Sequence, residues 1–187
     1  MGPCAGGAVY SPAITDFVIM VDKTAHMFIT GPEVIKTVTN EVVSFEDLGG
    51  AMTHASKSGV SHFTADSDDA ASQLARDLCD MFPSNNMDRA PIRKTSDSPD
   101  RSCDALTELI PEDTNKPYDV TDVVREVLDD GGFLEVQADY AMNIVCGFGH
   151  LAGHTVGVVA NQPKVLAGCL DIDASDKAAR FVRFCDA

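Results

Sequence analysis

The sequence of 187 residues predicts a mixed α/β protein in two parts, and three observations support this prediction. Short runs of apolar, β-branched and aromatic residues, typical of buried strands, recur in both halves. Amphipathic helix patterns accompany them, the clearest over residues 66–81. A stretch rich in proline, serine and aspartate, residues 84–117, separates the halves. We therefore predict domain parts over residues 1–83 and 118–187, joined by a linker over 84–117.

The first part opens on a glycine-rich turn, MGPCAGGAVYSP, with no strand predicted ahead of it. A short helix is predicted over residues 8–15, with Gly6 and Gly7 at its start. The following elements are two short buried strands (17–21 and 26–30), a helix with Pro32 at its first position and Glu33 in its first turn, a short helix capped by Ser44 and stopped by Gly49-Gly50, and the amphipathic helix 66–81, capped by Ser67 or Asp68.

The second part is predicted to hold a hairpin between two helices. Its expected elements are a helix over 120–128 stopped by Gly131-Gly132, strands over 133–137, 143–151 and 155–161, a hairpin turn at Gly153-His154, and a final helix over 175–185 with Ala178, Phe181, Val182 and Cys185 on one face.

Composition and net charge argue against two classes of function, nucleic-acid binding and membrane association. With 44% hydrophobic and 23% charged residues, the composition is that of a globular protein. A net charge of −15 argues against binding to nucleic acid, because phosphates would be repelled. The sequence has no run of 18 apolar residues and no cationic leader with an apolar core. We therefore expect no nucleic-acid partner and no membrane association.

Cysteine and histidine spacing indicates no metal site. The six cysteines lie far apart without a C-x-x-C pair, so we expect reduced thiols in a cytosol-like or matrix-like compartment. Two of the five histidines, His150 and His154, have a spacing that would share a helix face. Gly149 and Gly153 beside them favour a hairpin instead.

The glycine-rich turn has two interpretations. Backbone N–H groups at the start of a helix are unpaired and hold anionic oxygens, and glycine lets a substrate atom approach them. A tight turn with close packing also explains two adjacent glycines, and Gly6 and Gly7 taken alone favour this interpretation over an anion site.

Four ordered segments carry a resemblance to a known family. They are GPCAGGAVYSP (2–12), FITGPEVIKTVTNEVVSFEDLGGAMTHASKSGVSHF (28–63), FLEVQADYAMNIVCGF (133–148) and TVGVVANQPKVLAGCLDIDASDKAARFVRFCDA (155–187). In this order they resemble the carboxyltransferase (beta) subunits of biotin-dependent acyl-CoA carboxylases, and most closely the propionyl-CoA carboxylase type. The resemblance covers essentially the whole chain.

The resemblance implies a crotonase-like fold, a superhelix of ββα units, with fragments of two domains. Residues 1–83 would be the C-terminal part of the N-terminal carboxyltransferase domain, and 118–187 the N-terminal part of the C-terminal one. The family's upstream SGGAR-type and downstream VPGF-type segments are absent. We therefore expect a partial sequence, with Met1 an internal residue, that has no activity by itself.

The resemblance also implies a mechanism. The family transfers a carboxyl group from carboxybiotin to the α-carbon of propionyl-CoA or a related short acyl-CoA, giving methylmalonyl-CoA through an enolate. One oxyanion hole of the family falls on the backbone N–H groups of Gly6 and Gly7. Such donors stabilise developing negative charge, and removing one costs about 3–4 kcal/mol of barrier. No general base or metal in this subunit is implied.

The implied cofactor is biotin, carried on a partner protein or subunit, with acyl-CoA as substrate. The implied partners are a biotin carboxylase or biotin carrier subunit and further copies of the full-length subunit in a homo-oligomer. The expected location is the cytoplasm of a bacterium or, in a eukaryote, the mitochondrial matrix.

Two further segments have open roles. Residues 161–173, NQPKVLAGCLDID, would line a pocket or form a buried loop with a satisfied Asn161 and a capping Asp173. In that segment Lys164 would meet a phosphate or carboxylate, or stay solvated. The EDLGG sequence at 46–50 and the following His54 match a family motif, and we expect them to be structural and partly at the biotin entrance.

Two other functions remain open at this point. A methylmalonyl-CoA decarboxylase subunit would use the same reacting groups in the reverse direction. A short non-catalytic assembly partner would hold part of an oligomer surface without turnover.

Overall fold

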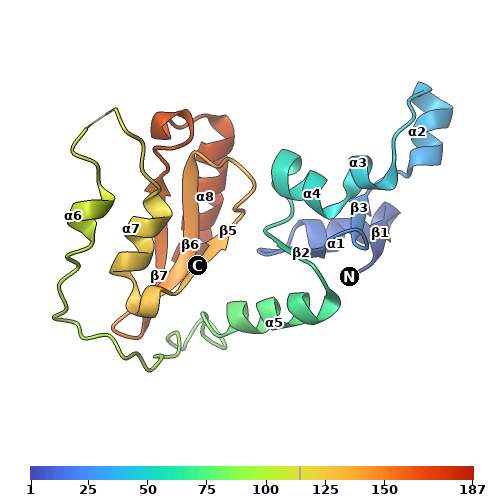
Figure 1. The fold of residues 1–187 in the computed structure, drawn as a ribbon. Helices are drawn as coiled ribbons and strands as arrows, with labels where there is room; N and C mark the ends of the chain where they lie inside the picture. Colours follow the sequence, from blue (N-terminus) through green and yellow to red (C-terminus); the bar gives the residue numbers. More distant parts are fainter. Residues whose placement is uncertain (114) are drawn as a thin grey trace. The chain divides into compact units, whose positions relative to one another are not determined.

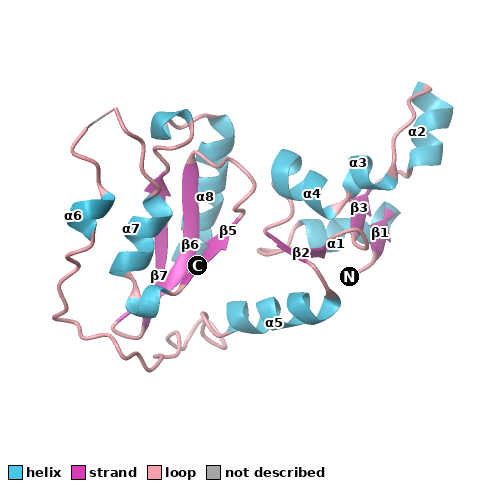
Figure 2. Ribbon diagram, in the orientation of Figure 1, coloured by secondary structure: helices cyan, strands magenta, loops and turns pink. Residues whose placement is uncertain are grey.

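The computed structural model describes residues 1–113 and 115–187, and the chain forms two compact units, Met1–Arg76 and Asp77–Ala187 (Figure 1). Both units combine helices with strands, which confirms the predicted α/β class (Figure 2). The units divide within a helix, α5.

The first unit holds four short strands in two parallel pairs, β1 with β3 and β2 with β4. In chain order its elements are β1 (Pro3–Ala5), the 3-10 helix η1 (Gly6–Val9), α1 (Tyr10–Ala13), β2 (Ile19–Val21), β3 (His26–Phe28), α2 (Pro32–Thr39), α3 (Phe45–Gly49), α4 (Ala51–Thr53), the π-helical turn η2 (His54–Ser58), β4 (Phe63–Ala65) and most of α5 (Asp68–Cys79).

The strand β1 corrects one prediction. We expected no strand ahead of the glycine turn, but Pro3–Ala5 pairs in parallel with His26–Phe28. Pro3 stands at the first position of the strand, where a missing N–H is tolerated. The pairing depends on a partner more than 20 residues away, which a local pattern of three residues does not reveal. Strand β4 was not predicted either, because its pairing partner β2 is also distant in the chain.

Helix starts follow the predicted capping residues. Pro32 is the first residue of α2, and the Ser44 side chain accepts the Asp47 N–H at the start of α3. At α5 the Ser67 hydroxyl accepts the Ala70 N–H at 3.2 Å, so Ser67 is the cap rather than Asp68.

Small and β-branched side chains fill the core of the first unit. Its buried members are Val9, Val18, Met20, Val21, Ala25, Met27, Ala51, Ala65 and Ala71. Val9 comes from η1, directly after the glycine turn, and is 5% exposed. Burial of Val9 therefore anchors the turn to the core.

The second unit is built on an antiparallel sheet of order β5-β6-β7. Its elements after α5 are α6 (Leu106–Leu109), α7 (Val120–Val127), η3 (Asp129–Gly131), β5 (Phe133–Val136), β6 (Ile144–Leu151), β7 (His154–Asn161), η4 (Leu166–Gly168) and α8 (Ile172–Asp186). All three predicted strands and both helices are confirmed. Ala152 and Gly153 form the hairpin turn with positive φ, while His154 already belongs to β7.

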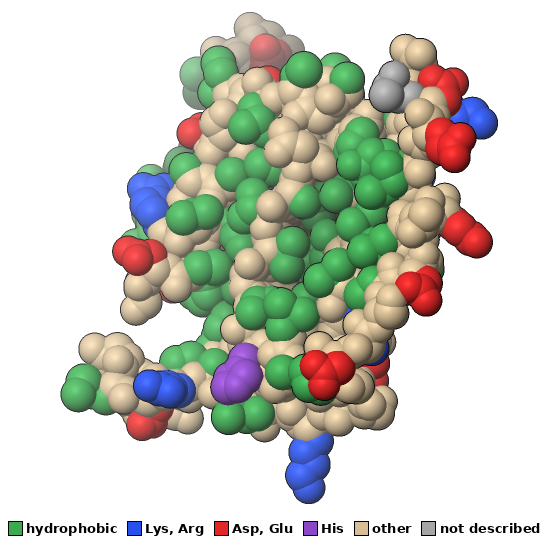
Figure 3. All heavy atoms as spheres, turned by 90° about the vertical axis from the view of Figure 1, so that its left-hand side faces the viewer, with side chains coloured by type: hydrophobic (Ala, Val, Ile, Leu, Met, Phe, Trp, Pro, Cys, Tyr) green, Lys and Arg blue, Asp and Glu red, His purple; other side chains and the backbone are tan. Residues whose placement is uncertain are grey.

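The central strand β6 is buried along almost its whole length. Gly147 and Gly149 let neighbouring groups approach, since a Cβ at Gly147 would lie 2.5 Å from the Leu134 carbonyl oxygen. An aromatic cluster packs against this strand, formed by Phe82, Phe148, Phe181 and Phe184 with ring centroids 4.9–5.9 Å apart. Figure 3 shows that hydrophobic side chains also spread over one outer face, with acidic groups at its margins.

The segment predicted as a linker is tethered to the second unit. Its Arg101 guanidinium donates to the Glu126 and Leu128 carbonyl oxygens at 2.6 and 3.2 Å, and the Arg93 N–H donates to the Gly153 carbonyl at 2.9 Å. One turn of helix, α6, also forms within it. Thr114, in the same predicted linker, lies outside the described residues. The assignment of 1–83, 84–117 and 118–187 to domains and linker stays a prediction.

Candidate functional site: the glycine turn

The glycine turn joins β1 to η1 and continues the pairing with β3. The Gly6 N–H donates to the Ile29 carbonyl oxygen at 3.1 Å, one residue beyond the ladder of β1 and β3. Gly6 has φ +64°, a left-handed conformation that favours glycine. The chain therefore leaves β1 and enters η1 at Gly6; the helix start at the two glycines is as predicted, whereas the strand before it is not.

Close packing does not explain the second glycine. A Cβ built at Gly6 or Gly7 would meet no atom within 4 Å. Gly6 is explained by its positive φ, but Gly7 has neither a positive φ nor a crowded environment. Within the described residues, neither packing nor backbone conformation therefore requires glycine at position 7.

The two N–H groups of the turn are not equivalent. The Gly6 N–H already has an acceptor, Ile29 O, whereas the hydrogen bonds of the described residues give the Gly7 N–H none. Gly7 itself is exposed. Tyr10 and Ile29 beside the turn are 55% and 58% exposed. The turn thus presents one free donor and an apolar border, which suits an anionic oxygen attached to an apolar group. The pairing of Gly6 with Gly7 as an oxyanion hole stays a prediction.

The EDLGG segment and His54 contact the backbone of β3. The His54 Nε2 lies 2.6 Å from the Met27 carbonyl oxygen and its Nδ1 lies 2.7 Å from the Ser58 hydroxyl, so Nε2 carries the proton. A Cβ at Gly49 would lie 2.1 Å from the Met27 carbonyl oxygen. Both ring nitrogens of His54 are thus engaged within the chain, which supports a structural role.

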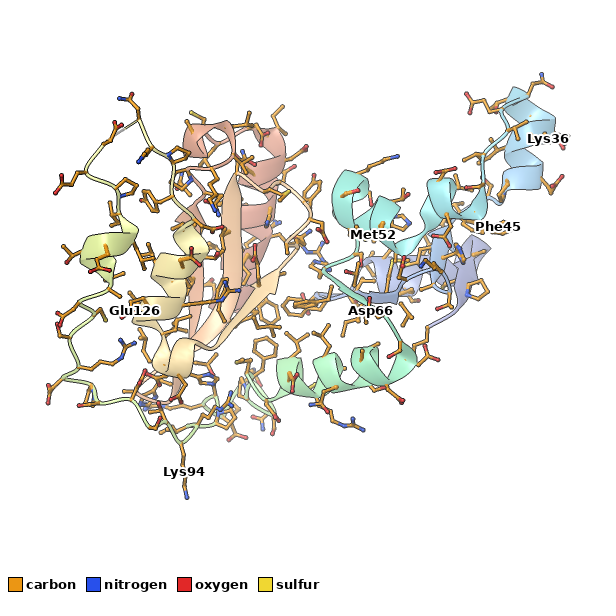
Figure 4. The ribbon with its side chains drawn as sticks, viewed as in Figure 1. Lys36, Phe45, Met52, Asp66, Lys94 and Glu126 are labelled. Carbon is orange, nitrogen blue, oxygen red and sulfur yellow. The ribbon has the colours of Figure 1, made fainter. Side chains whose placement is uncertain are left out.

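Phe45 and Glu46 hold the start of α3 against His26. The Glu46 Oε1 lies 2.6 Å from the His26 Nε2, and the Phe45 ring packs on His26 and Phe28 with centroid distances of 5.9 and 5.6 Å (Figure 4). These contacts fix α3 to the strand that also pairs with β1. The glycine turn and the EDLGG segment therefore both contact β3.

Residues 161–173 form a hydrogen-bonded loop that is mostly exposed, so the prediction that this loop is buried is wrong. Asn161 donates to the Gly168 carbonyl at 2.6 Å, which confirms the satisfied Asn161. The cap of α8 is Asp171, which accepts the Ala174 N–H at 2.9 Å, so the prediction of Asp173 as the cap is wrong. The helix begins two residues before Ala174 because Asp171 is the residue with extended backbone.

Lys164 contacts a carboxylate, as one of the predicted alternatives states, and its side chain stays half exposed. Its Nζ lies 3.2 Å from Asp119 Oδ2, and Gln162 donates to the other oxygen of the same carboxylate at 2.8 Å. Burial raises the pKa of Asp119, but hydrogen bonds from Thr121, Gln162 and Lys164 outweigh it and hold the pKa well below its usual range. This network joins the loop to the start of α7.

The thiols and histidines show no further constellation in the described residues. No group of three metal-ligating side chains occurs among residues 1–113 and 115–187. Within the same residues, none of the helices combines the length and apolar character needed to cross a membrane. All six cysteines are free, and burial raises the pKa of the Cys146 thiol to about 11. His150 lies on β6 beside the predicted hairpin, whereas His154 is the first residue of β7 and not part of the hairpin turn in which it was predicted.

Sequence reasoning missed Lys177. Its Nζ donates to the carbonyl oxygens of Gln137, Tyr140 and Ile144 at 2.8–2.9 Å, and the residue is 2% exposed. A signal was present, because Lys177 lies three residues after Ala174 and four before Phe181 on the buried face of α8.

The whole chain, residues 1–187, matches the carboxyl transferase domain family, and the protein belongs to this family. This confirms the resemblance, and with it the crotonase-like fold.

Three relatives define the comparison. The chain is 59% identical over its full length to the propionyl-CoA carboxylase carboxyltransferase subunit of Haloferax mediterranei, and covers 36% of that subunit. It is 57% identical to the methylmalonyl-CoA decarboxylase subunit alpha of Veillonella parvula, again over its full length, and covers 37% of it. A solved structure of transcarboxylase 12S, described as a hexamer with methylmalonyl-coenzyme A and methylmalonic acid bound, is 52% identical with a TM-score of 0.94. The similarity covers 99% of this chain and 36% of that one.

The chain thus spans about a third of the length of these relatives.

Proposed function

We propose that this chain is part of a carboxyltransferase subunit that transfers a carboxyl group from biotin to the α-carbon of propionyl-CoA or a related short acyl-CoA. The observation that carries the proposal is the 59% identity to the Haloferax mediterranei carboxyltransferase subunit over the full length of the chain. On this proposal the two compact units belong to the N-terminal and C-terminal carboxyltransferase domains.

The glycine turn supplies the chemistry proposed for this part of the subunit. Negative charge develops on an oxygen when the acyl-CoA loses its α-proton, and backbone N–H donors stabilise that charge without changing protonation. The Gly7 N–H is exposed and without an acceptor in the described residues, and no Cβ blocks it. Gly6 provides the left-handed conformation directly before Gly7, at the junction of β1 and η1. We therefore propose that the Gly7 N–H donates the hydrogen bond to the developing oxyanion, and that Gly6 sets the backbone conformation of the turn.

The cofactor, partners and location follow from the same proposal. Biotin, carried on a biotin carrier or biotin carboxylase subunit, would supply the carboxyl group, and copies of the full-length subunit would assemble with one another. The hexamer described for transcarboxylase 12S supports this assembly. A cytoplasmic or mitochondrial location fits relatives such as the mitochondrial propionyl-CoA carboxylase beta chain of Sus scrofa, which is 51% identical.

A graft tests the proposed activity. Residues 1–187 replace the matching segment of the Haloferax mediterranei subunit, and the assembled enzyme is assayed for incorporation of radiolabelled bicarbonate into acetyl-CoA, propionyl-CoA and butyryl-CoA. We expect carboxylation, with propionyl-CoA preferred. A graft that assembles normally but carboxylates none of the three substrates would contradict the proposal.

Substitutions in the graft test the role of the turn. Gly7→Pro removes the N–H at a position in the first helical turn where proline is tolerated, and we expect a loss of about 100- to 1000-fold in kcat, the effect typical of one oxyanion donor. Gly7→Ala keeps the N–H and adds a methyl group in open space, so a smaller loss is expected. Equal activity of Gly7→Pro and the parent graft would remove Gly7 from the mechanism.

The decarboxylase remains a second candidate because the identity to the Veillonella parvula subunit, 57%, is nearly as high. Grafting the same residues into that subunit measures the reverse direction. If only this second graft turns over, the chain belongs with the decarboxylases.

A further inference from the structure

The His54 side chain binds the edge of β3 that faces away from β1. Its Nε2 donates to the Met27 carbonyl oxygen at 2.6 Å. The N–H of His26, the preceding residue, donates in the opposite direction, to the carbonyl oxygen of Gly2 directly before β1. Consecutive residues of a strand direct their backbone groups to opposite edges, so β3 is held by β1 on one edge and by His54 on the other.

The glycine turn depends on β3 for its position. In the part of the chain that the structure describes, β3 is the only strand paired with β1. The Gly6 N–H continues this pairing through the Ile29 carbonyl oxygen at 3.1 Å, two residues beyond Met27. Gly7 follows directly, and the buried Val9 fixes the far side of the turn. A shift of β3 therefore moves the Gly6 and Gly7 N–H groups relative to Val9.

A π-helical turn fixes the orientation of the imidazole. His54 and Ser58 are the first and last residues of η2, and the Ser58 hydroxyl lies 2.7 Å from His54 Nδ1. Because Nδ1 accepts this hydroxyl, the ring proton is on Nε2, where it meets the Met27 carbonyl oxygen. Turns of this kind are rare and frequently occur at functional sites. The π-helical turn thus directs one ring donor at β3.

Two other side chains that hold α3 to β3 are more exposed than His54. Glu46 lies 2.6 Å from His26 Nε2, but its side chain is 46% exposed, and exposed ion pairs contribute little. Phe45 packs on the His26 ring and is 54% exposed. A ring contact tolerates small displacements, whereas the hydrogen bond from His54 to Met27 is directional. The bond from His54 is therefore the contact that fixes the register of β3 on this edge.

We propose that His54 is a positioning residue for the glycine turn, acting through β3. Its bond to Met27 holds the register in which Ile29 engages Gly6 and the Gly7 N–H stays exposed. The structural part of this inference, the position of the turn, is independent of the activity. The catalytic part, the placement of the Gly7 donor toward the enolate oxygen, rests on the proposed function. Both ring nitrogens of His54 are bonded within the chain, so the ring acts through the backbone and touches no reacting atom.

Amide exchange in the chain of residues 1–187 tests the structural part. His54→Leu removes the donor, and we expect the Gly6 N–H, followed by NMR, to exchange at least about tenfold faster. The Asp22 N–H is the internal reference, because it donates to the Ala65 carbonyl oxygen at 2.9 Å at the end of the pairing of β2 with β4. A general loss of stability would accelerate both amides, whereas a displaced β3 accelerates Gly6 alone.

Two further variants complete the comparison. His54→Gln keeps an N–H donor near the position of Nε2 and should restore the slow exchange of Gly6. Thr53→Val is the matched control, because the Thr53 hydroxyl donates to the Glu46 carbonyl oxygen at 2.9 Å and not to β3, so Gly6 should be unaffected. The structural part is overturned if His54→Leu leaves Gly6 exchange unchanged, if Gly6 and Asp22 accelerate alike, or if His54→Gln behaves as His54→Leu does.

The same variants in the grafted subunit test the catalytic part. We expect His54→Leu to lower kcat about 10- to 100-fold with KM changed by less than about twofold, since a misplacement of about 1 Å has effects of this size. His54→Gln should retain most of kcat. A loss of kcat in Gly7→Pro with an unchanged kcat in His54→Leu would overturn the catalytic part and leave the proposed function standing. A parent graft without activity would contradict the proposed function and with it the catalytic part, while amide exchange still decides the structural part.

Discussion

The ammonium group of Lys177 is buried and bonded to three backbone carbonyl oxygens of the chain between β5 and β6. Two residues of this connection, Gln137 and Ala141, have positive φ, of 53° and 43°. Such conformations are costly for residues with side chains and persist only where the surroundings hold them. Lys177 contributes three hydrogen bonds that hold this connection. Burial lowers its pKa, and the negative charges of nearby acidic groups such as Glu135 and Asp139 partly oppose this shift.

Replacing Lys177 tests this role. Lys177→Met keeps the length of the side chain but leaves three carbonyl groups without their donor, so we expect a loss of about 2–4 kcal/mol in the free energy of unfolding. Urea denaturation followed by circular dichroism measures it. Arg183→Met, an exposed position on the same helix, is the control and should change stability by less than about 0.5 kcal/mol. A similar effect of both variants would refute the role of Lys177.

The pKa of His150 is lowered by burial first and by Arg93 second. The unfolded chain therefore binds a proton near pH 6.5 that the folded chain binds only at lower pH. The stability that neutral His150 provides is fully present above pH 6.5 and is lost as pH falls through 6.5 towards its pKa in the folded chain. Glu135, whose pKa burial raises, contributes with the opposite sign.

Comparing the parent chain with His150→Gln isolates the contribution of His150 to the pH dependence of stability. Unfolding free energies of the parent chain and His150→Gln are measured by urea denaturation from pH 7.5 to 5. We expect a shallower fall with acidification in the variant, because Glu135 and the other groups are common to both. His154→Gln should follow the parent. A fall as steep in His150→Gln as in the parent would contradict this explanation.

At the scale of elements, charged groups hold residues 93–103 against α7, η3 and the hairpin turn. Arg101 reaches the last carbonyl groups of α7 and bonds Asp97 at 3.1 Å, while Asp97 accepts the Asp130 N–H at 2.9 Å. Cations at the end of a helix satisfy its unpaired carbonyl groups. This segment is therefore attached by polar contacts at several points.

Removing Arg101 is expected to release the segment. In Arg101→Met, the amide hydrogens of Arg93 and Asp130, both bonded across this contact, should exchange about tenfold faster or more, since a charge-assisted hydrogen bond contributes about 1.5–3 kcal/mol. Amide exchange by mass spectrometry or NMR measures this. Arg89→Met is the control. Unchanged amide exchange in Arg101→Met would show that the other contacts are sufficient to hold residues 93–103 in place.

In the whole molecule, the net charge of −15 lowers the free energy of unfolding, because folding brings like charges closer together on a compact surface. Two like charges 10 Å apart in water repel by about 0.4 kcal/mol. The Debye length falls from about 30 Å at 0.01 M salt to about 8 Å at 0.15 M. Several such pairs are thereby screened when salt is added.

Salt should therefore stabilise the chain. Between 0.01 and 0.15 M sodium chloride we expect the free energy of unfolding to rise by about 1–2 kcal/mol. Thermal or urea denaturation at each salt concentration measures this, and sucrose at equal osmolality is the uncharged control. A decrease in stability with salt would mean that attractive ion pairs outweigh the repulsion.

Local sequence patterns were sufficient to predict the fold class, the longer elements and the location of the glycine turn. Helix caps, glycine stops and apolar periodicity are local, so Pro32, Ser44 and the three strands of the second unit were predictable from neighbours a few residues away. The four ordered segments were specific enough to define the family.

Which groups remain available for chemistry depends on contacts between residues far apart in the chain. Long-range pairing created β1 and β4, engaged the Gly6 N–H with Ile29 and left the Gly7 N–H open. It also paired Lys164 with Asp119 and buried the His150 side chain to 6% exposure. These outcomes depend on atoms far apart in the chain, because a hydrogen bond or a desolvated cavity is defined by where groups meet and not by the residue types alone.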